Sequence, residues 1–320
     1  MPLPAATFTG YQSWRVYENE HPCVRLRIIA YFRSMRKLMA LAAFICICFA
    51  TIAQSGRVLE NETVKSKILN MERKYAVYLP PDYNNSERHY PVLYLLHGGG
   101  DDHTGWVQFG EVLNITDKAI REGAATPMVI IMPDANTGKR GYYNDIEGKW
   151  NYEDFFFNEL MPEVEKKFRI RTDKRYRAVA GLSMGGGGSF LYALHHPELF
   201  SAACPLSASV GALTLEEFKQ NLAKNNVKVS DDVVSKYFSR NNITSMVNNM
   251  PDTLKKSVRW YIDCGDDDFL YEGNSLMHIL MRKREIPHEY RVRDGVHSWV
   301  YWRAALPVVL EFISMGFHQF

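Results

Sequence analysis

The sequence is poor in the features that mark several specialised protein classes. Its 320 residues include 5 cysteines, too few and too scattered for a disulfide scaffold. The 14 prolines and 21 glycines are too few for a fibrous or low-complexity chain. With 38 basic and 36 acidic side chains, it lacks the basic excess that a general nucleic-acid binder needs. A hydrophobic fraction of 46% excludes disorder, so function must be inferred from motifs in a globular chain.

Long apolar runs are also scarce, with one exception near the N-terminus. Two basic residues after Met35 precede an apolar run that ends at Ala53. This layout is typical of a secretory signal peptide, and about 16 apolar residues are short of the roughly 20 that a membrane anchor needs. We therefore predict a signal peptide at 35–53 and a mis-assigned extension at 1–34. The mature protein is expected to be periplasmic or extracellular, without stable membrane insertion.

The remaining chain, 54–320, has no repeat or linker and is predicted to be one domain. Apolar runs alternate with amphipathic ones, which indicates an α/β fold with a mostly parallel central sheet and helices on both faces. The predicted strands are 74–79, 91–96, 128–132, 176–180, 201–206, 258–263 and 289–293, and the predicted helices include 151–168, 189–195, 275–284 and 299–313. Cys204 and Cys264 lie in strand-like runs and are expected to be buried thiols rather than a disulfide.

One stretch interrupts this alternation. Residues 213–256 are rich in Asn and Lys, contain helical fragments and offer no strand. We interpret this stretch as a small helical cap inserted over the carboxyl ends of the strands, where α/β sheets bind their ligands. The alternative is a surface decoration unrelated to the site.

The segment Gly181–Gly185 carries the clearest chemical signal. It reads Gly-Leu-Ser-Met-Gly and lies between a strand-like and a helix-like run, the context of a nucleophile elbow. In such a turn the serine is strained and its hydroxyl exposed, while larger flanking side chains would clash with backbone. Three more glycines, 186–188, let the following helix pack closely on the sheet. A glycine-rich turn of another kind is the alternative, but the Lys-Ser/Thr of a phosphate loop is missing. Ser183 is the predicted nucleophile.

A serine becomes reactive when a histidine removes its proton and a carboxylate orients that histidine. In α/β-hydrolases these partners follow in the order Ser, Asp, His. The strand at 258–263 is followed by three aspartates, Asp266–Asp268, and the strand at 289–293 is followed by His297. We predict His297 as the base and Asp268 as the acid, with Asp267 as the alternative. The aspartates could also form a solvated turn or a calcium loop. No histidine spacing resembles a zinc site, and no metal is predicted.

The oxyanion that forms on acyl transfer needs backbone donors held in place. One is expected to be the amide of Met184, directly after the serine. The other is expected from the loop after the strand at 91–96, which reads His-Gly-Gly-Gly, the pattern of esterases. We assign it to Gly99, with Gly98 and Gly100 as neighbouring possibilities.

Together these motifs resemble the branch of the α/β-hydrolases that includes esterase D (S-formylglutathione hydrolase), the feruloyl and acetylxylan esterases of carbohydrate esterase family 1, and the antigen 85 mycolyltransferases. The resemblance spans roughly residues 74–312 and rests on segments 95–100, 180–186, 262–268 and 295–299. In feruloyl esterases the acid is the third residue after the glycine that ends the strand, which is Asp268 here. The segment 297–302 is similar to that around the mycolyltransferase histidine, while the insertion at 213–256 departs from the family core.

The resemblance implies an α/β-hydrolase fold and a serine esterase that acts without a cofactor, and the predicted signal peptide implies that it is exported. Its expected substrate is a small acyl ester or an acylated plant polysaccharide, with a feruloyl or acetyl group. Acyl transfer to an acceptor other than water is the first alternative, and a catalytically idle carbohydrate-binding fold is the second. Aromatic residues near the motifs are candidates for substrate contact: Trp106, Tyr142, Tyr143, Trp150, Phe269 and Trp299.

Overall fold

The computed structural model describes Tyr31 and residues 33–37, 54–135 and 141–318. Residues 55–320 form one compact unit. In the unit that precedes it, Tyr31 and residues 33–37 are helical and exposed. The predicted extension at 1–34 and signal peptide at 35–53 otherwise lie outside the described residues.

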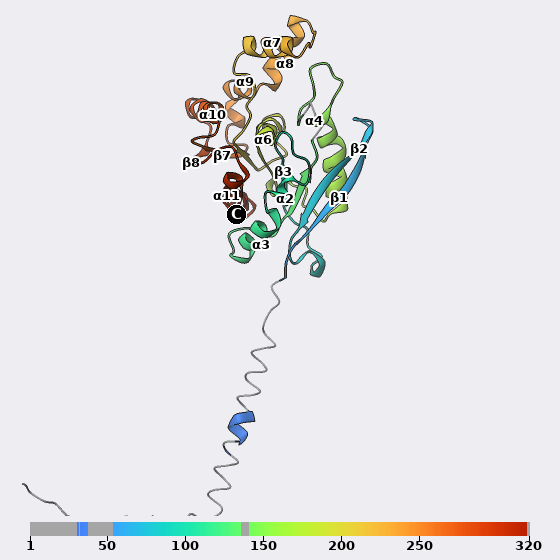
Figure 1. The fold of residues 1–320 in the computed structure, drawn as a ribbon, viewed down its shortest axis with the longest axis vertical. Coiled ribbons are helices and arrows are strands. Elements are labelled where there is room, and N and C mark those ends of the chain that lie inside the picture. Colours follow the sequence, from blue (N-terminus) through green and yellow to red (C-terminus); the bar gives the residue numbers. More distant parts are fainter. Residues whose placement is uncertain (1–30, 32, 38–53, 136–140, 319–320) are drawn as a thin grey trace, which may run out of the picture. The chain divides into compact units, whose positions relative to one another are not determined.

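A single sheet of eight strands forms the centre of this unit, in the order β1-β2-β4-β3-β5-β6-β7-β8 (Figure 1). The first two strands and the β2–β4 pair are antiparallel, and every pair from β4 through β3 to β8 is parallel. All carboxyl ends of the parallel strands therefore meet at one edge of the sheet. The strands are β1 (Arg57–Ser66), β2 (Met71–Leu79), β3 (Val92–Leu96), β4 (Val129–Pro133), β5 (Arg177–Leu182), β6 (Ala202–Leu206), β7 (Arg259–Gly265) and β8 (His288–Arg293).

The apolar runs predicted the strands β2 to β8, with each end within three residues of its observed place. Strands β3 to β6 are buried along their whole length, which explains their continuous apolar sequences. Strand β1 was not predicted. It is an edge strand in which only Val64 and Ser66 are buried, so its sequence shows neither an apolar run nor a regular alternation.

Helices cover both faces of the sheet, as predicted. Side chains of α6 and α10 belong to the core on one face, and side chains of α3 and α11 belong to the core on the other. The helices outside the cap are α2 (Gly105–Gln108), α3 (Val112–Arg121), α4 (Tyr152–Phe155), α5 (Met161–Lys167), α6 (Met184–His195), α10 (Tyr271–Lys283) and α11 (Trp299–His318), with 3₁₀ turns at Tyr83–Asn85 and Lys174–Tyr176.

The helix predicted at 151–168 is interrupted by a π-helical turn. This turn spans Phe156–Leu160, between α4 and α5, and Pro162 lies in the first turn of α5. A proline has no amide proton to donate and its ring crowds the preceding turn, so the regular i to i−4 bonding cannot continue through it. The wider turn still buries Phe156 and Leu160 against the sheet.

Helix α11 is long and apolar enough to cross a membrane by length and composition. However, 61% of its most apolar 18-residue stretch is buried inside the unit, and its side chains Leu306, Val309 and Leu310 belong to the core. A core helix of a globular unit passes the same test. Cys204 and Cys264 are likewise buried, and both are free thiols, as predicted for small apolar side chains.

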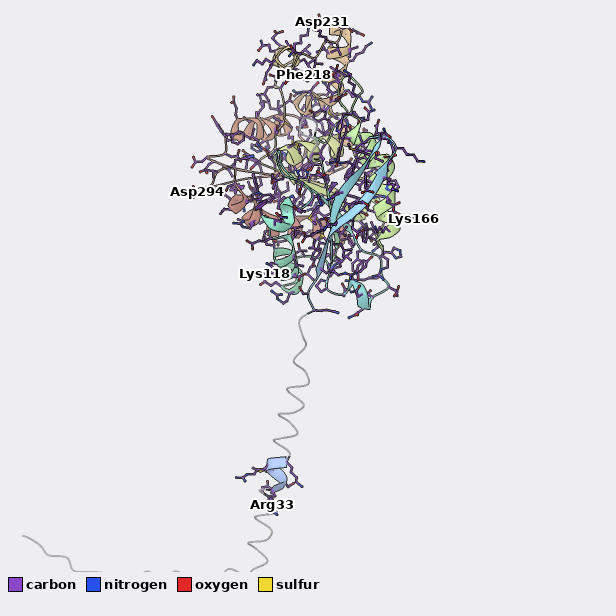
Figure 2. The ribbon with its side chains drawn as sticks, turned by 45° about the vertical axis from the view of Figure 1, so that its right-hand side comes forward. Arg33, Lys118, Lys166, Phe218, Asp231 and Asp294 are labelled. Carbon is purple, nitrogen blue, oxygen red and sulfur yellow. The ribbon has the colours of Figure 1, made fainter. Side chains whose placement is uncertain are left out.

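The segment predicted as a helical cap consists of helices. These are α7 (Leu215–Lys224), α8 (Asp231–Asn241), α9 (Ile243–Asn248) and a 3₁₀ turn at Asp252–Leu254. Each of these three helices begins with a residue whose side chain accepts a hydrogen bond from a backbone amide in the first turn. These residues are Thr214 for α7, Ser230 for α8 and Asn242 for α9. Helices α7 and α8 lie at one end of the domain, as Phe218 and Asp231 show in Figure 2.

One histidine ties the end of α8 to the layer beneath it. His195, at the end of α6, has its Nδ1 2.6 Å from Glu153 Oε1 and its Nε2 2.9 Å from the carbonyl oxygen of Arg240. Both partners are acceptors, so both ring nitrogens must carry a proton and the imidazole is a cation. Burial and the charge of Arg240 lower the pKa of His195, but its bonds to Glu153 and to the carbonyl outweigh them and raise it.

This contact predicts a pH-dependent contribution to stability. Because the folded-state pKa of His195 is raised, its contribution is complete below the ordinary pKa of about 6.5 and is lost as the pH rises through the folded value. His195→Gln should therefore lower the free energy of unfolding by about 1–3 kcal/mol at pH 5.5 and by less at pH 9. Urea unfolding across this range measures the difference, and Glu153→Gln should show the same trend. A cost independent of pH would contradict the ion pair.

Candidate active site

Ser183 lies at a sharp turn between β5 and α6. Its backbone has φ 54° and ψ −115°, a conformation that costs a non-glycine residue about 1–3 kcal/mol. Three backbone bonds hold the turn: the Ser183 amide donates to Leu206 O at 2.9 Å, and the Ser183 carbonyl accepts from the amides of Gly187 and Ser209 at 3.0 and 2.9 Å. In the described part of the chain these are the hydrogen bonds of Ser183, and they leave its hydroxyl free and half-buried.

The glycines around Ser183 are required by close backbone contacts. A Cβ atom on Gly181 would lie 2.5 Å from Gly185 O, and one on Gly185 would lie 2.6 Å from His97 O. Along α6, a Cβ on Gly186 would lie 2.7 Å from Leu206 O and one on Gly187 would lie 2.2 Å from Ser209 O. The glycine run therefore lets α6 rest on the backbones that follow β3 and β6.

The loop after β3 is held by the buried side chain of His97. Its Nε2 accepts from the amide of Ala135 at 2.9 Å, so its Nδ1 carries the proton and donates to Gly98 O at 2.8 Å. Burial lowers the pKa of His97 below its ordinary value, which keeps the ring in this neutral form. The His97 amide donates to the Tyr142 hydroxyl at 2.8 Å. These hydrogen bonds fix the conformation of the loop after β3.

The predicted second oxyanion donor lies in that loop. A Cβ on Gly98 would lie 3.5 Å from Ser183 Cβ, which places the loop against the serine. Gly99 follows, exposed, with no atom within 4 Å of the position a Cβ would take. Met184 is the first residue of α6, where backbone amides have no partner inside the helix.

His297 and Asp268 form a direct pair. His297 Nδ1 lies 2.8 Å from Asp268 Oδ2 and 3.0 Å from Oδ1, and the Leu270 amide donates to Oδ1 at 2.8 Å. The Asp268 side chain is fully buried and that of His297 is 16% exposed. Burial alone raises the pKa of Asp268, but hydrogen bonds from His297, Leu270 and Ser207 bring it below its ordinary value. Asp268 is therefore ionised, and His297 has Nε2 left to accept a proton.

The neighbouring aspartates lie in a different environment. Asp266 and Asp267 are exposed, and together with the exposed Asp294 they form a group of carboxylates whose oxygens lie within 4.8 Å of one another. Asp266 Oδ1 accepts from the Gly295 amide at 3.0 Å, and neither residue bonds to His297 in the described part of the chain. Of the aspartates considered from the sequence, the structure brings Asp268 to His297.

Two residues that the sequence analysis did not single out as site residues connect Ser183 with this pair. Ser207 follows Leu206, which binds the Ser183 amide, and its Oγ accepts from Trp302 Nε1 at 3.1 Å. Trp302 also packs edge-on against His297, with ring centroids 4.8 Å apart. Ser207 has φ 42°, so a strained residue lies at the end of β6 as well. Its position after the strand between β5 and β7 is the signal that could have identified it.

A buried carboxylate fixes the strands that lead to the acid and the base. Asp263, on β7, has no exposed side-chain surface and accepts hydrogen bonds from Tyr261 at 2.6 Å, Tyr301 at 2.5 Å and Arg293 at 2.6 Å. These donors come from β7, α11 and the end of β8. Asp263 therefore ties together the elements on either side of the loop that carries His297.

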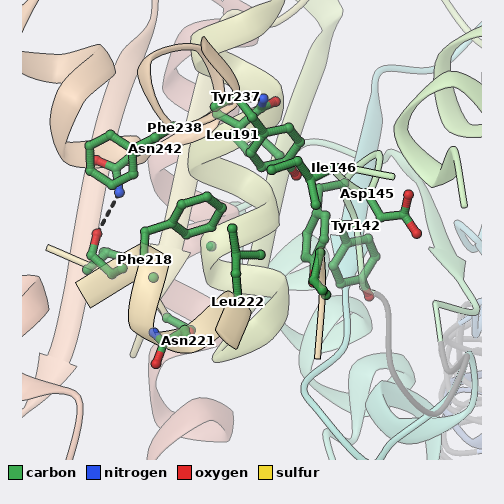
Figure 3. A pocket seen from close by; sticks show the side chains of 18 of the residues that line it. Tyr142, Asp145, Ile146, Leu191, Phe218, Asn221, Leu222, Tyr237, Phe238 and Asn242 are labelled. Carbon is green, nitrogen blue, oxygen red and sulfur yellow. Dashed lines mark hydrogen bonds between the residues drawn. The ribbon is translucent and has the colours of Figure 1, made fainter. Parts of the chain in front are cut away.

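A cavity of about 900 Å³ lies between the cap and the start of α6. Met184, Gly187 and Gly188 line it from α6, and the cap contributes Phe218 and Tyr237, whose rings stack 5.8 Å apart at 5°. Figure 3 shows these two rings with the other lining side chains, which include Tyr142, Leu191, Asn221, Leu222, Phe238 and Asn242. The insertion therefore forms a wall of this cavity and is more than a surface decoration.

The aromatic residues proposed from the sequence have different surroundings. Tyr142 and Tyr143 line the cavity. Trp106 is 1% exposed and donates to Leu96 O, so it is a core residue that a substrate cannot reach. Trp150 is half-buried and stacks on Tyr152, and it does not line the cavity. Phe269 and Trp299 lie on the other side, near His297, and Phe269 is 71% exposed.

Comparison with known proteins shows the family and the fold of this chain. Residues 66–313 match the model of the Esterase family, described as Putative esterase. A solved structure of a ferulic acid esterase is similar with a TM-score of 0.72 and 35% identity, over 82% of this chain and 99% of that one. The S-formylglutathione hydrolase of Staphylococcus aureus, at 21% identity and a TM-score of 0.64, shares the fold over 81% of this chain and 99% of that one.

Curated relatives match a shorter part of this chain or match it at lower identity. An endo-1,4-beta-xylanase/feruloyl esterase of Xylanibacter ruminicola is 38% identical over 135 residues, which are 39% of this chain and 18% of that protein. Esterase Rv1288 of Mycobacterium tuberculosis is 40% identical over 131 residues, 40% of this chain and 27% of that protein. The acetyl esterase of Caldicellulosiruptor saccharolyticus is 24% identical over 78% of this chain and 95% of its own. The chain thus spans less than a third of the length of the Xylanibacter and Mycobacterium relatives.

The packing of α6 predicts that its glycines cannot be replaced. Gly187→Ala would place a methyl group 2.2 Å from Ser209 O, so helix or loop must move, at a cost of about 1–3 kcal/mol of folding free energy. Gly99→Ala is the matched control, because no atom lies within 4 Å of its Cβ position. Denaturant unfolding of both variants measures the difference. Equal stability of the two would show that α6 tolerates a wider separation from the sheet.

Proposed function

We propose that this chain, which belongs to the Esterase family and has the α/β-hydrolase fold, is an exported serine esterase that removes an aromatic acyl group from a plant polysaccharide. Its class as a carboxylic ester hydrolase follows from the family. The triad, the acyl group and export are our proposals. The observation that carries the triad is the buried Asp268–His297 pair at the sheet edge where Ser183 occupies a strained turn.

In the proposed reaction His297 Nε2 takes the proton of the Ser183 hydroxyl as its oxygen attacks the ester carbonyl carbon. The amides of Met184 and Gly99 donate hydrogen bonds to the oxyanion. His297 then gives the proton to the leaving alcohol oxygen, and the carbon–oxygen bond breaks to leave Ser183 acylated. Water attacks this ester next and loses its proton to His297, which passes that proton to the Ser183 oxygen as the carbon–oxygen bond to the serine breaks and the acid leaves. These steps use side chains and backbone amides of the chain and require no cofactor.

The burial of Asp268 supports its role over that of Asp267. A carboxylate that orients an imidazole must stay ionised and must keep water away from the shared proton. Asp268 meets both needs, since it is fully buried and its pKa lies below the ordinary value. Asp267 is exposed to solvent.

Replacing each aspartate by its amide tests the assignment. Asp268→Asn should lower kcat by about 10⁴-fold, because an amide favours the wrong tautomer of His297. Asp267→Asn is the matched control and should keep at least half of the activity. Initial rates on a small ester such as 4-nitrophenyl acetate measure both, with Ser183→Ala as the inactive reference. A larger loss in Asp267→Asn than in Asp268→Asn would move the acid by one residue, and retained activity in Ser183→Ala would refute the triad.

The cavity supports an aromatic acyl group. Since His297 must reach the leaving alcohol, that alcohol lies toward His297, and the acyl group extends the other way, past Met184. The cavity begins there. Its volume is within the roughly 300–1,000 Å³ of pockets for drug-sized ligands, far more than the methyl group of an acetate needs. Aromatic faces and the amides of Asn221 and Asn241 suit a ring that carries oxygen substituents.

Acyl selectivity should therefore depend on the cap. We expect a higher kcat/KM for methyl ferulate than for methyl acetate. Phe218→Ala removes one ring of the stacked pair and should lower kcat/KM for ferulate by about 10-fold, with little effect on acetate. Val233→Ala on α8 is the control, because Val233 is exposed and does not line the cavity. Equal losses on both esters would show that the cap stabilises the fold rather than selecting the acyl group.

Export is proposed from the sequence of residues 35–53, which lie mostly outside the described residues. A polysaccharide substrate requires the enzyme to leave the cytoplasm, so the two proposals agree. The ferulic acid esterase of known structure and the xylanase/feruloyl esterase of Xylanibacter ruminicola are the relatives whose names match this substrate.

A further inference from the structure

A continuous row of aromatic rings crosses the histidine side of the candidate site. Phe269 lies 4.4 Å from the His297 ring and Trp302 lies 4.8 Å from it, measured between ring centroids. The row continues from Trp302 to Trp299 at 5.4 Å and from Trp299 to Phe109 at 5.9 Å. The proposed base is thus one member of a row that begins and ends at the surface.

The two ends of the row are exposed to solvent. Phe269 is 71% exposed and Phe109 is 49% exposed, whereas Trp302 in the middle is buried. Val296 and Val300, beside His297 and Trp299, are 52% and 69% exposed. Isolated exposed apolar residues are common, but here Phe269 packs against the proposed base and Phe109 packs against Trp299, and together with the two valines they indicate a binding surface. These side chains are absent from the lining of the cap cavity.

Carboxylates lie on the same two loops. Asp267 is two residues before Phe269, and Asp294 is three residues before His297; both belong to the exposed group that includes Asp266. Figure 2 shows Asp294 at the side of the domain, well away from Phe218 in the cap. The carboxylate group that adjoins the row therefore lies apart from the cap ring Phe218.

We propose that this row, with Phe269 as its main contact, binds the saccharide that forms the alcohol part of the ester. The inference rests on the proposed function, because it uses His297 as the group that protonates the leaving oxygen. That oxygen must come within hydrogen-bond distance of His297, so the sugar attached to it lies over the neighbours of His297. The C–H faces of a sugar pack on aromatic rings, and its hydroxyls find acceptors in the adjacent carboxylates. A purely aliphatic alcohol would not use these acceptors.

The reaction scheme separates this surface from the acyl cavity. Two esters with the same acyl group and different alcohols give the same acyl-enzyme, and water then releases it at the same rate. A residue that contacts the alcohol therefore changes acylation, and with it kcat/KM, for the ester whose alcohol it touches. It does not change the turnover of the shared acyl-enzyme.

The test compares Phe269→Ala with the unchanged protein on three feruloyl esters: methyl ferulate, a feruloylated xylo-oligosaccharide and dodecyl ferulate. We expect kcat/KM for the oligosaccharide ester to fall about 10-fold, and that for methyl ferulate to stay within twofold. Dodecyl ferulate should lose less than the oligosaccharide. Phe269→Trp should restore the preference for the oligosaccharide. Ile279→Ala is the control, an exposed apolar residue on α10 outside the row.

Each contrary outcome has one meaning. An equal loss on all three esters would show that Phe269 only holds His297 in place, and no loss on any would show that the sugar lies elsewhere; both overturn the proposal. A greater loss on dodecyl ferulate would assign the row to aliphatic alcohols and would overturn it too. If the unchanged protein hydrolyses none of these esters, or if Ser183→Ala hydrolyses them equally well, the proposed function itself fails.

Discussion

The close approach of α6 to the sheet is the constraint on which the rest of the site depends. Gly185, Gly186 and Gly187 leave room for the backbones of His97, Leu206 and Ser209 where side chains would stand, and Gly181 leaves room for the backbone of Gly185. Ser183 occupies its strained turn between these close contacts, and the loop after β3 lies beside it. It also sets the floor of the cap cavity, because Gly187 and Gly188 line that cavity directly. One packing requirement thus positions the proposed nucleophile, the proposed oxyanion donors and the acyl side of the site.

The sequence predicted the parts of this structure that local patterns encode. Fully buried strands have continuous apolar sequences, and the glycines around Ser183 mark a turn that excludes side chains. The residues that depend on tertiary contacts were not predicted. Strand β1 is an exposed edge, and Ser207 acquires its position only when β6 lies between β5 and β7. The π-helical turn near Pro162 buries Phe156 although the proline has no amide proton for the regular helical hydrogen bond. Hydrophobic periodicity alone does not reveal such a turn.

Choosing among neighbouring residues shows where sequence reasoning reaches its limit. Asp266, Asp267 and Asp268 are chemically identical, and only their burial separates them. Asp268 alone is enclosed and bonded to His297, and the aromatic candidates divide in a similar way. Trp106 is a core residue, whereas Phe269 projects into solvent beside His297. A motif identifies the loop in which a function resides, and the packing of the neighbouring elements decides which side chain performs it.

The two sides of the proposed site differ in a way that fits a polymeric ester. On the acyl side the cap forms one wall of a cavity, and the α8 end of the cap is held to α6 through the His195 cation. A pocket can select a group by its size and shape when that group ends inside the pocket. On the histidine side the proposed sugar contact, Phe269, is exposed to solvent, so a chain bound there can extend away from the protein. An enzyme that must release one small acid from a long polymer needs this combination, because the acid can be enclosed and the polymer cannot.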